Sequence, residues 1–151
     1  MDQPPVTQNQ RLRIVLDTNV WLDWLVFADP CVAAIRAAVA DGRAELFIDG
    51  PCEAELERVL GYDLGRRFTL HATAQSACLA ECRRIAHRIG TAAPEAERAA
   101  LPACRDRDDQ KFLEAALAAE ADVLVTKDRA LLDLARRSAR CRIVAPEDFP
   151  D

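Results

Sequence analysis

The sequence predicts an α/β fold, a three-layer α/β/α sandwich built on a mostly parallel central sheet. Short apolar runs rich in β-branched residues alternate along the chain with longer segments whose apolar residues recur at helical spacing. Strands that alternate with helices pair in parallel and are covered by helices on both faces. With 151 residues, 50% of them hydrophobic, the chain can bury one such core, so we expect a single domain over residues 12–151.

The composition narrows the classes of protein that fit. Residues 1–11 are polar and contain a pair of prolines, so we expect a flexible N-terminal tail. There is no apolar run of the roughly 20 residues that span a membrane and no secretory signal pattern, so we expect a cytoplasmic protein. The six cysteines include no CxxC pair and fit buried, reduced thiols. A net charge of −5 argues against binding of nucleic acid by overall charge, but not against a nuclease whose acidic residues bind cations.

The first half of the chain predicts two strands and three helices. In order, these are a strand at 12–16, a helix at 31–40, a strand at 45–48, a helix at 52–60 and a longer amphipathic helix at 72–90. Gly42 ends the first of these helices, and Pro51 precedes the second, where the missing N–H of proline is tolerated.

The second half predicts two more helices and two more strands. A loop at 91–105 contains two prolines, and a helix then starts near residues 106–109 and runs to about Glu120. A strand at 123–126, a helix at 129–138 and a last short strand at 142–144 complete the chain.

Two aspartates follow apolar strands. Asp17 comes directly after the first strand, and Asp128 comes shortly after the apolar run that ends at Val125. In a parallel sheet the carboxyl ends of the strands share one edge, where ligands collect. We therefore expect the two carboxylates to emerge on the same edge of the sheet.

A third acid is selected by its position on a helix. In the helix that starts near Asp106, Phe112, Leu113 and Ala116 form one apolar arc, and Asp109 lies in the middle of it. A carboxylate in a core-facing stripe is costly unless a cation or hydrogen bonds satisfy it. The alternative is a capping role, in which Asp109 stabilises the helix N-terminus in a cap begun by Asp106.

The helix at 52–60 offers a fourth acid. Glu55 lies near one edge of its apolar arc and Glu53 borders the other, so helical geometry does not choose between them. The alternative for Glu55 is an ordinary solvated surface glutamate.

Four segments of the chain resemble the PIN-domain family, and in particular the small bacterial PIN proteins that are toxins of toxin–antitoxin pairs. They are RIVLDTNVWL at 13–22, AELERVL at 54–60, RDRDDQKFLEAALAAEADVLVTKDRALL at 105–132 and RIVAPEDF at 142–149. Their order and spacing carry the resemblance, since the DTN triplet alone is weak evidence. One departure is local: the family often has a small hydroxyl residue before its second helix, and this chain has Asp49-Gly50-Pro51 there.

The resemblance implies a PIN-like fold whose acidic residues bind a divalent metal. The acids that it places in metal binding and catalysis are Asp17, Glu55, Asp109 and Asp128. The residues that it places in secondary or supporting roles are Asn19, Asp106, Asp108 and Thr126. The A-E-L form of the second motif favours Glu55 over Glu53, and Asn19 would brace the first aspartate. Because every donor is a hard oxygen, Mg²⁺ or Mn²⁺ is the expected cofactor.

The function that the resemblance implies is a metal-dependent endoribonuclease, the toxin of a toxin–antitoxin pair, with RNA as substrate, a cognate antitoxin as partner and a homodimeric assembly. The alternative is a catalytically silent PIN-fold module that binds RNA or protein, which the presence of all four acids disfavours. His71 and His87 lie outside the acidic motifs, which argues against a nuclease with a histidine base. A phosphoryl-transfer domain of the dehalogenase type is disfavoured because Asn19 stands where that pattern has a second aspartate.

Basic residues on the predicted helix at 72–90 are candidates for contacts with RNA phosphates or with a partner protein. Arg83, Arg84 and Arg88 form one contiguous arc with His87 at helical spacing. The alternative is a solvated helix face.

Overall fold

The computed structural model describes residues 10–62 and 70–150. Of the predicted tail at 1–11, only the last two residues fall within this range, so the prediction lies almost entirely outside the described residues. None of the helices in the described part of the chain is long and apolar enough to cross a membrane.

The centre of the molecule is a five-stranded sheet in which each neighbouring pair of strands is parallel. Its strands are β1 (Leu12–Leu16), β2 (Ala44–Asp49), β3 (Ala86–Ile89), β4 (Val123–Val125) and β5 (Arg142–Val144). Their order across the sheet is β3-β2-β1-β4-β5, so the first strand lies in the middle. The apolar run at 12–16 lies between β2, which pairs with it from Leu12↔Ala44 to Val15↔Phe47, and β4, which pairs with it from Ile14↔Val123 to Leu16↔Val125.

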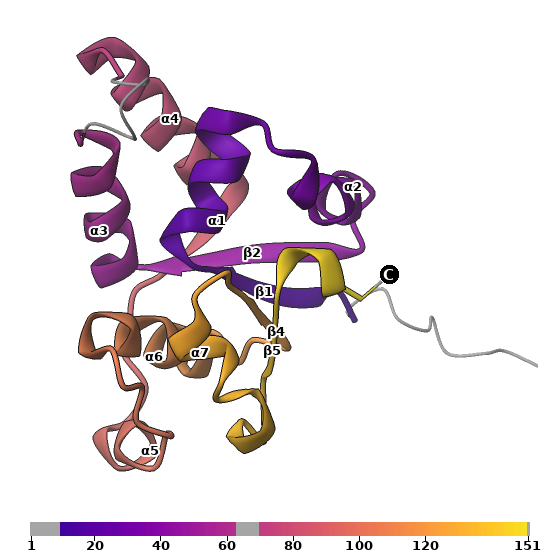
Figure 1. Cartoon of the computed structure of the whole chain (residues 1–151), viewed down its shortest axis with the longest axis vertical. Coiled ribbons are helices and arrows are strands. Elements are labelled where there is room, and N and C mark those ends of the chain that lie inside the picture. Colours follow the sequence, from indigo (N-terminus) through magenta and orange to yellow (C-terminus); the bar gives the residue numbers. More distant parts are fainter. Residues whose placement is uncertain (1–9, 63–69, 151) are drawn as a thin grey trace, which may run out of the picture.

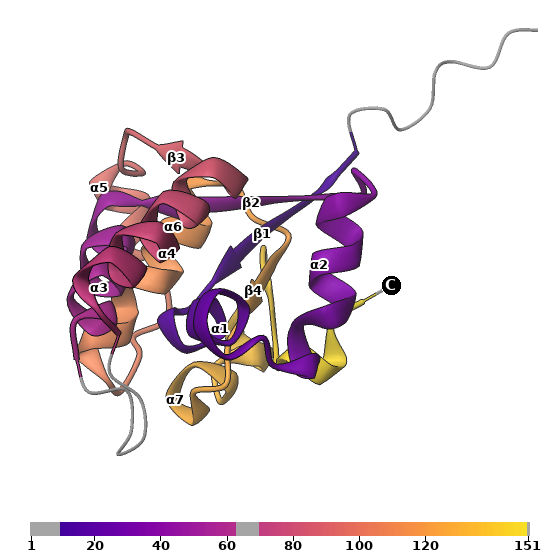
Figure 2. The ribbon, with the colours of Figure 1, turned by 90° about the horizontal axis from the view of Figure 1, so that it is seen from above.

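Helices cover both faces of the sheet, which confirms the predicted three-layer sandwich. They are α1 (Thr18–Leu22), α2 (Ala33–Ala40), α3 (Gly50–Leu60), α4 (Ala72–Ile85), α5 (Glu95–Ala99), α6 (Gln110–Ala118) and α7 (Arg129–Leu132). Figure 1 shows α1 and α2 above the strands, with α6 and α7 below them. Figure 2, seen from above, shows α3 and α4 grouped on one side of the molecule and α2 on the other.

The core is continuous across the layers. The largest fully buried side chains include Ile14 and Leu16 on β1 and Leu124 on β4, with Phe112 of α6 packed in the same cluster. Parallel strands covered on both faces are apolar on both sides, which explains why the run at 12–16 shows no polar alternation past Arg13.

The predicted helix at 72–90 is wrong in its last part. The helix ends at Ile85, and Ala86–Ile89 form the edge strand β3, which pairs with β2 from Leu46↔Ala86 to Asp49↔Ile89. Local spacing fits a longer helix, but hydrogen bonding to the exposed edge of β2 overrides that local preference. As a consequence Arg83 lies on a helix and Arg88 on a strand, so the contiguous helical arc of basic residues does not exist.

Other boundaries differ by shorter amounts. A 3-10 turn at Pro30–Val32 precedes α2, and the predicted loop at 91–105 contains the short helix α5. The predicted helix at 129–138 stops at Leu132 and is followed by a 3-10 turn at Ala135–Arg137. The entry into α3 is capped by Asp49, whose Oδ1 accepts a hydrogen bond from the Cys52 amide at 3.0 Å, so an aspartate does the work of the missing hydroxyl residue.

Candidate metal centre

Asp17 and Asp128 stand at the carboxyl ends of two neighbouring parallel strands. Asp17 follows β1 and caps α1, with its Oδ1 accepting from the Val20 amide at 2.9 Å. Asp128 follows β4 and caps α7, with its Oδ1 accepting from the Ala130 amide at 2.9 Å. Because β1 and β4 pair in parallel, both carboxylates emerge at the same edge of the sheet, as predicted.

Thr126 joins these two acids. Its hydroxyl donates a short hydrogen bond to Asp17 Oδ2 and accepts one from the backbone amide of Asp128 at 2.9 Å. The residue has no exposed surface, so water does not compete for these bonds. Thr126 therefore fixes the position of one carboxylate and the start of the loop that carries the other.

Asp109 does not act as a cap. It lies at the end of a 3-10 turn at Arg107–Asp109, directly before α6, and its side chain makes no capping hydrogen bond. Asp106 begins the cap of that turn, as the alternative supposes, by accepting from the Asp108 amide at 3.0 Å, and Asp109 is an acid of the same turn. Oδ2 of Asp109 is buried, and no N–H group or hydroxyl of the described residues donates to it. A buried carboxylate oxygen without a donor is costly, and a cation would satisfy it.

Carboxylate oxygens of Asp106, Asp109 and Asp128 lie within 4.8 Å of one another. Burial, followed by a hydrogen bond to Asp128 and the charges of the neighbouring acids, raises the pKa of Asp109 to about 8. The same hydrogen bond from Asp109 lowers the pKa of Asp128. These opposite shifts favour one proton shared by the two carboxyl groups in the metal-free protein, because ionising both so close together is unfavourable.

Asp17 lies beside this group, and its pKa is also raised. Burial raises its pKa and the charge of Asp128 adds to the rise, while hydrogen bonds from Thr126 and Val20 oppose it. Asp17 is 3% exposed. A carboxylate this buried is stabilised in its charged form by donors or by a cation.

The structure separates Glu53 from Glu55, which the helical spacing did not. Glu53 is 8% exposed, and its carboxylate pairs with Arg83 at 2.9 Å and with Arg88 at 3.1 Å. A Cβ atom at Gly50 would stand 3.1 Å from Nη2 of Arg88, so the glycine at the start of α3 allows this close approach. Both oxygens of the Glu53 carboxylate therefore pair with arginine.

Glu55, on the same helix, has different partners from Glu53. Its Oε2 accepts a short hydrogen bond from the Thr18 hydroxyl, next in sequence to Asp17, and its Oε1 lies 2.5 Å from Nζ of Lys111. Glu55 is not part of the group within 4.8 Å that Asp106 belongs to, and neither is Asp17. The structure thus brings Asp109 and Asp128 together, places Asp17 beside them, and bonds Glu55 to Thr18 and Lys111.

The remaining predicted residues take different positions. Asn19 is exposed, and the side-chain oxygens of Asp17 are bonded by Val20 and Thr126 instead. Asp106 is exposed but belongs to the acidic group, whereas Asp108 is exposed and contributes its backbone carbonyl to Lys111. Sequence reasoning missed Thr18 and Lys111; the available signal was a lysine in the first turn of a helix, where a positive charge is unfavourable.

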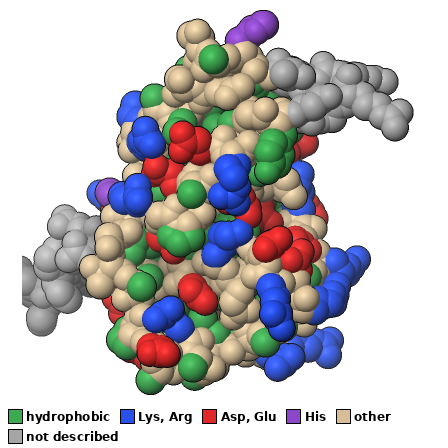
Figure 3. Space-filling view, turned by 90° about the vertical axis from the view of Figure 1, so that its left-hand side faces the viewer, with side chains coloured by type: hydrophobic (Ala, Val, Ile, Leu, Met, Phe, Trp, Pro, Cys, Tyr) green, Lys and Arg blue, Asp and Glu red, His purple; other side chains and the backbone are tan. Residues whose placement is uncertain are grey.

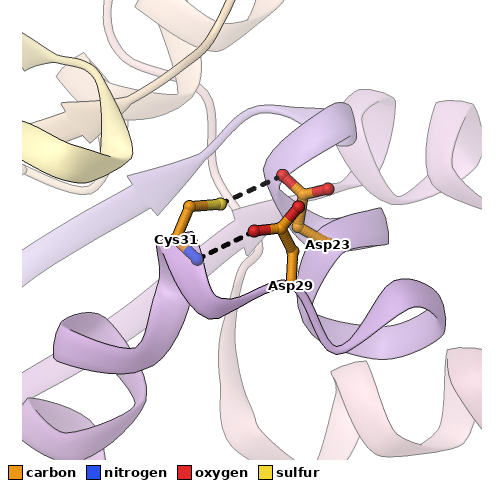
Figure 4. A group of neighbouring side chains, drawn as sticks. All are labelled: Asp23, Asp29 and Cys31. Carbon is orange, nitrogen blue, oxygen red and sulfur yellow. Dashed lines mark hydrogen bonds between the residues drawn. The ribbon is translucent and has the colours of Figure 1, made fainter.

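A second group of potential ligands, Asp23, Asp29 and Cys31, lies between α1 and α2 (Figure 4). The thiol of Cys31 donates to Asp23 Oδ2, and its amide donates to Asp29 at 2.8 Å. Nζ of Lys127 pairs with the buried Asp23 at 2.6 Å. Burial, with the nearby carboxylates, raises the pKa of Cys31 to about 12. This group is a closed network, because a lysine balances its buried charge and its thiol is protonated.

Comparisons with known proteins agree with this architecture. The family model of the PIN domain matches residues 13–130. The chain also resembles the crystal structure of VapBC2 from Rickettsia felis bound to a DNA fragment from their promoter, with a TM-score of 0.59 and 15% identity over 87% of this chain and 97% of that chain. At that identity the likeness concerns the fold alone. No curated protein matches the chain.

Proposed function

The chain belongs to the PIN-domain family, and from that premise we propose that it is a divalent-metal-dependent ribonuclease that hydrolyses RNA phosphodiester bonds. The proposed ligands are Asp17, Glu55, Asp109 and Asp128, with Asp106 and Asp108 in secondary positions. All of their donor atoms are oxygens, which suits Mg²⁺ or Mn²⁺ rather than a softer metal.

The observation that carries the proposal is the buried oxygen of Asp109 that no N–H group or hydroxyl of the described residues bonds, within the acidic group at the carboxyl edge of the sheet. Structural acids are normally paired with arginine or lysine, as Glu53 is in this chain. Here an acid instead faces other acids, and its pKa is raised. Perturbed carboxylates gathered in this way are typical of catalytic and metal sites.

A divalent cation bound there would polarise a water molecule and offset charge on the leaving oxygen. The chain's own residues prepare the centre for it. Thr126 fixes Asp17 and the backbone of Asp128, so that these carboxylates need little reorganisation. The pair Asp109 and Asp128 holds one proton, which it can release as the site fills and the acids become charged.

The attacking water loses its proton to a carboxylate or to solvent rather than to a histidine. His87 is exposed on β3, with its ring 5.2 Å from that of Phe47 and its Nε2 3.4 Å from Glu45. His71 is exposed and precedes α4. Both histidines of the chain therefore serve elsewhere, which keeps the proposal within metal-assisted hydrolysis.

For the RNA backbone we propose contacts with Arg83 and Arg88. Glu53 holds both guanidinium groups in place, yet their side chains remain 57% and 55% exposed, with donors free for phosphate oxygens. Arg84 is a weaker candidate, because its guanidinium forms a bidentate pair of hydrogen bonds with the carboxylate of Glu81 on the same helix. Figure 3 shows basic and acidic side chains interleaved over much of one face of the molecule, so these contacts would be local rather than part of a broad basic stripe.

We further propose a biological role as the toxin of a toxin–antitoxin pair, which places the protein in the cytoplasm with its RNA substrate. The resemblance of the sequence segments to such toxins supports this role. The structural neighbour, VapBC2 bound to promoter DNA, supports a protein antitoxin as partner. We also propose that the protein forms a homodimer, as the resemblance of its sequence implies.

The test is cleavage of structured RNA by purified protein with Mg²⁺ or Mn²⁺, beside the same reaction in chelator. Asp17→Asn removes a proposed ligand charge, and Asp41→Asn removes an exposed carboxylate whose side chain is 62% exposed and bonded to Arg43. We expect wild type and Asp41→Asn to cleave and Asp17→Asn to lose most activity.

The second candidate function, a silent module that binds RNA or protein, gives a different pattern. In that case folded wild type retains RNA in a filter-binding assay, and neither it nor Asp17→Asn cleaves any of several substrates with either metal. That result would remove the enzyme assignment and leave the PIN fold in place.

A further inference from the structure

Both oxygens of the Glu55 carboxylate are occupied by donors of the protein itself. Nζ of Lys111 lies 2.5 Å from Oε1, and the Thr18 hydroxyl donates to Oε2. The ion pair is largely enclosed, with 21% of the lysine side chain and 17% of the glutamate side chain exposed. The fourth acid of the proposed metal site is therefore already bonded to an ammonium group.

Lys111 stands where a helix disfavours a positive charge. It lies in the first turn of α6, close to the positive end of the helix dipole. Its Nζ lies 2.6 Å from the carbonyl oxygen of Asp108 and 5.5 Å from the centroid of the Phe112 ring. These contacts hold the ammonium against Glu55, whose carboxylate compensates for the unfavourable position.

Lysine is rare in this chain. Of twenty basic residues only two are lysines, Lys111 and Lys127, and both pair with buried or half-buried acids near the carboxyl edge of the sheet. An ammonium is a compact, strongly hydrated point charge, closer in character to a small metal cation than the planar guanidinium of arginine is.

We propose that Lys111 is a positioning residue that serves as a resident counter-ion: it holds Glu55 in the metal-free protein and is displaced from it when a divalent cation binds. The inference rests on the proposed metal site and adds to it a step in its loading. In the metal-free protein the ammonium reduces the repulsion among the acids. On loading, Glu55 exchanges the lysine for the metal.

A simpler role for the pair is to clamp α6 onto α3, two helices that contact each other. A clamp would be indifferent to metal, whereas a counter-ion must compete with it. The two roles therefore give opposite expectations for metal affinity when Lys111 is changed.

The first experiment measures Mg²⁺ affinity by calorimetry for Lys111→Met and for Lys127→Met, after circular dichroism has verified that each variant is folded. Both variants lose one positive charge near the centre, but Lys127 pairs with Asp23 and not with a proposed ligand. We expect Lys111→Met to bind Mg²⁺ about tenfold more tightly than Lys127→Met, which corresponds to about 1.4 kcal/mol. Equal affinities would overturn the proposal.

The second experiment measures the two lysines of the wild-type protein directly. Wild type labelled with ¹³C at the lysine side chains gives two Cε–Hε signals, and Lys111→Arg assigns them. We expect the Lys111 signal to shift on addition of Mg²⁺ and to saturate with the calorimetric Kd, while the Lys127 signal moves less. Binding with an unmoved Lys111 signal overturns the counter-ion role but leaves the metal site intact. Absence of any Mg²⁺ or Mn²⁺ binding overturns both, and the two failures are thus distinguishable without an activity assay.

Discussion

The raised pKa of Asp109 predicts that the metal-free protein becomes less stable as the pH rises from about 4 toward 8. The pKa is about 8 in the folded protein and 3.8 for an ordinary aspartate. Below about pH 4 the group is protonated in both the folded and the unfolded chain and costs nothing. As the pH rises toward 8, the unfolded chain gains from ionisation while the folded protein does not, so the free energy of unfolding falls. Replacing the acid by a neutral amide removes this penalty.

The magnitude follows from the shift. At 1.36 kcal/mol per pH unit, the whole pKa shift would lower the free energy of unfolding by about 4 kcal/mol at pH 7. Access of solvent to the site and proton sharing with Asp128 reduce this, so we expect Asp109→Asn to stabilise the metal-free protein by about 1–2 kcal/mol at pH 7. For a chain of this length that is a rise in Tm of about 3–6 °C. The amide can still donate to Asp128, so the substitution is mild.

The assay is thermal unfolding in chelator, followed by circular dichroism between about pH 4 and pH 8. Asp41→Asn serves as the control, because that carboxylate is exposed and paired with Arg43. We expect the advantage of Asp109→Asn to grow with pH and to vanish near pH 4. If Asp109→Asn lowers Tm at pH 7, or changes it equally at every pH, the burial and proton sharing inferred for Asp109 are wrong.

Two further substitutions test the support of the site. Thr126→Val removes the donor to Asp17 and the acceptor for the amide of Asp128, so we expect the free energy of unfolding to fall by about 1–3 kcal/mol, with partial recovery in Thr126→Ser; urea denaturation measures both. Glu53→Gln deprives two arginines of their partner, so we expect Tm to drop by about 2–4 °C while Mg²⁺ affinity stays at the wild-type value. A collapse of that affinity would show that Glu53, rather than Glu55, serves the metal.

The acids at strand ends were predictable because their positions depend on one rule of topology. Once the runs at 12–16 and 123–125 are parallel neighbours, Asp17 and Asp128 must share an edge. Asp109 was predictable from helical spacing. Asp106 begins a cap, as the alternative role for Asp109 supposes, but the Asp109 side chain makes no capping hydrogen bond. Asn19, the predicted brace, is exposed, and the hydroxyl of Thr126, which the resemblance places among the supporting residues, donates to Asp17.

What the sequence did not predict depends on partners that are distant in the chain. Ala86–Ile89 continue a helical pattern, and only pairing with β2 turns them into a strand. The choice between Glu53 and Glu55 likewise depends on arginines 30 and 35 positions away and on a lysine 56 positions away. Spacing within one helix carries no information about such contacts, whereas the family pattern did favour Glu55.

The most direct test of the metal centre is a calorimetric titration of Mn²⁺ into wild type and Asp17→Asn at pH 7, repeated in two buffers of different ionisation enthalpy. We expect wild type to bind Mn²⁺ with release of about one proton, the one shared by Asp109 and Asp128, and Asp17→Asn to bind far more weakly. Equal binding by the two proteins, or no binding by folded wild type, would contradict a metal site at the carboxyl edge of the sheet.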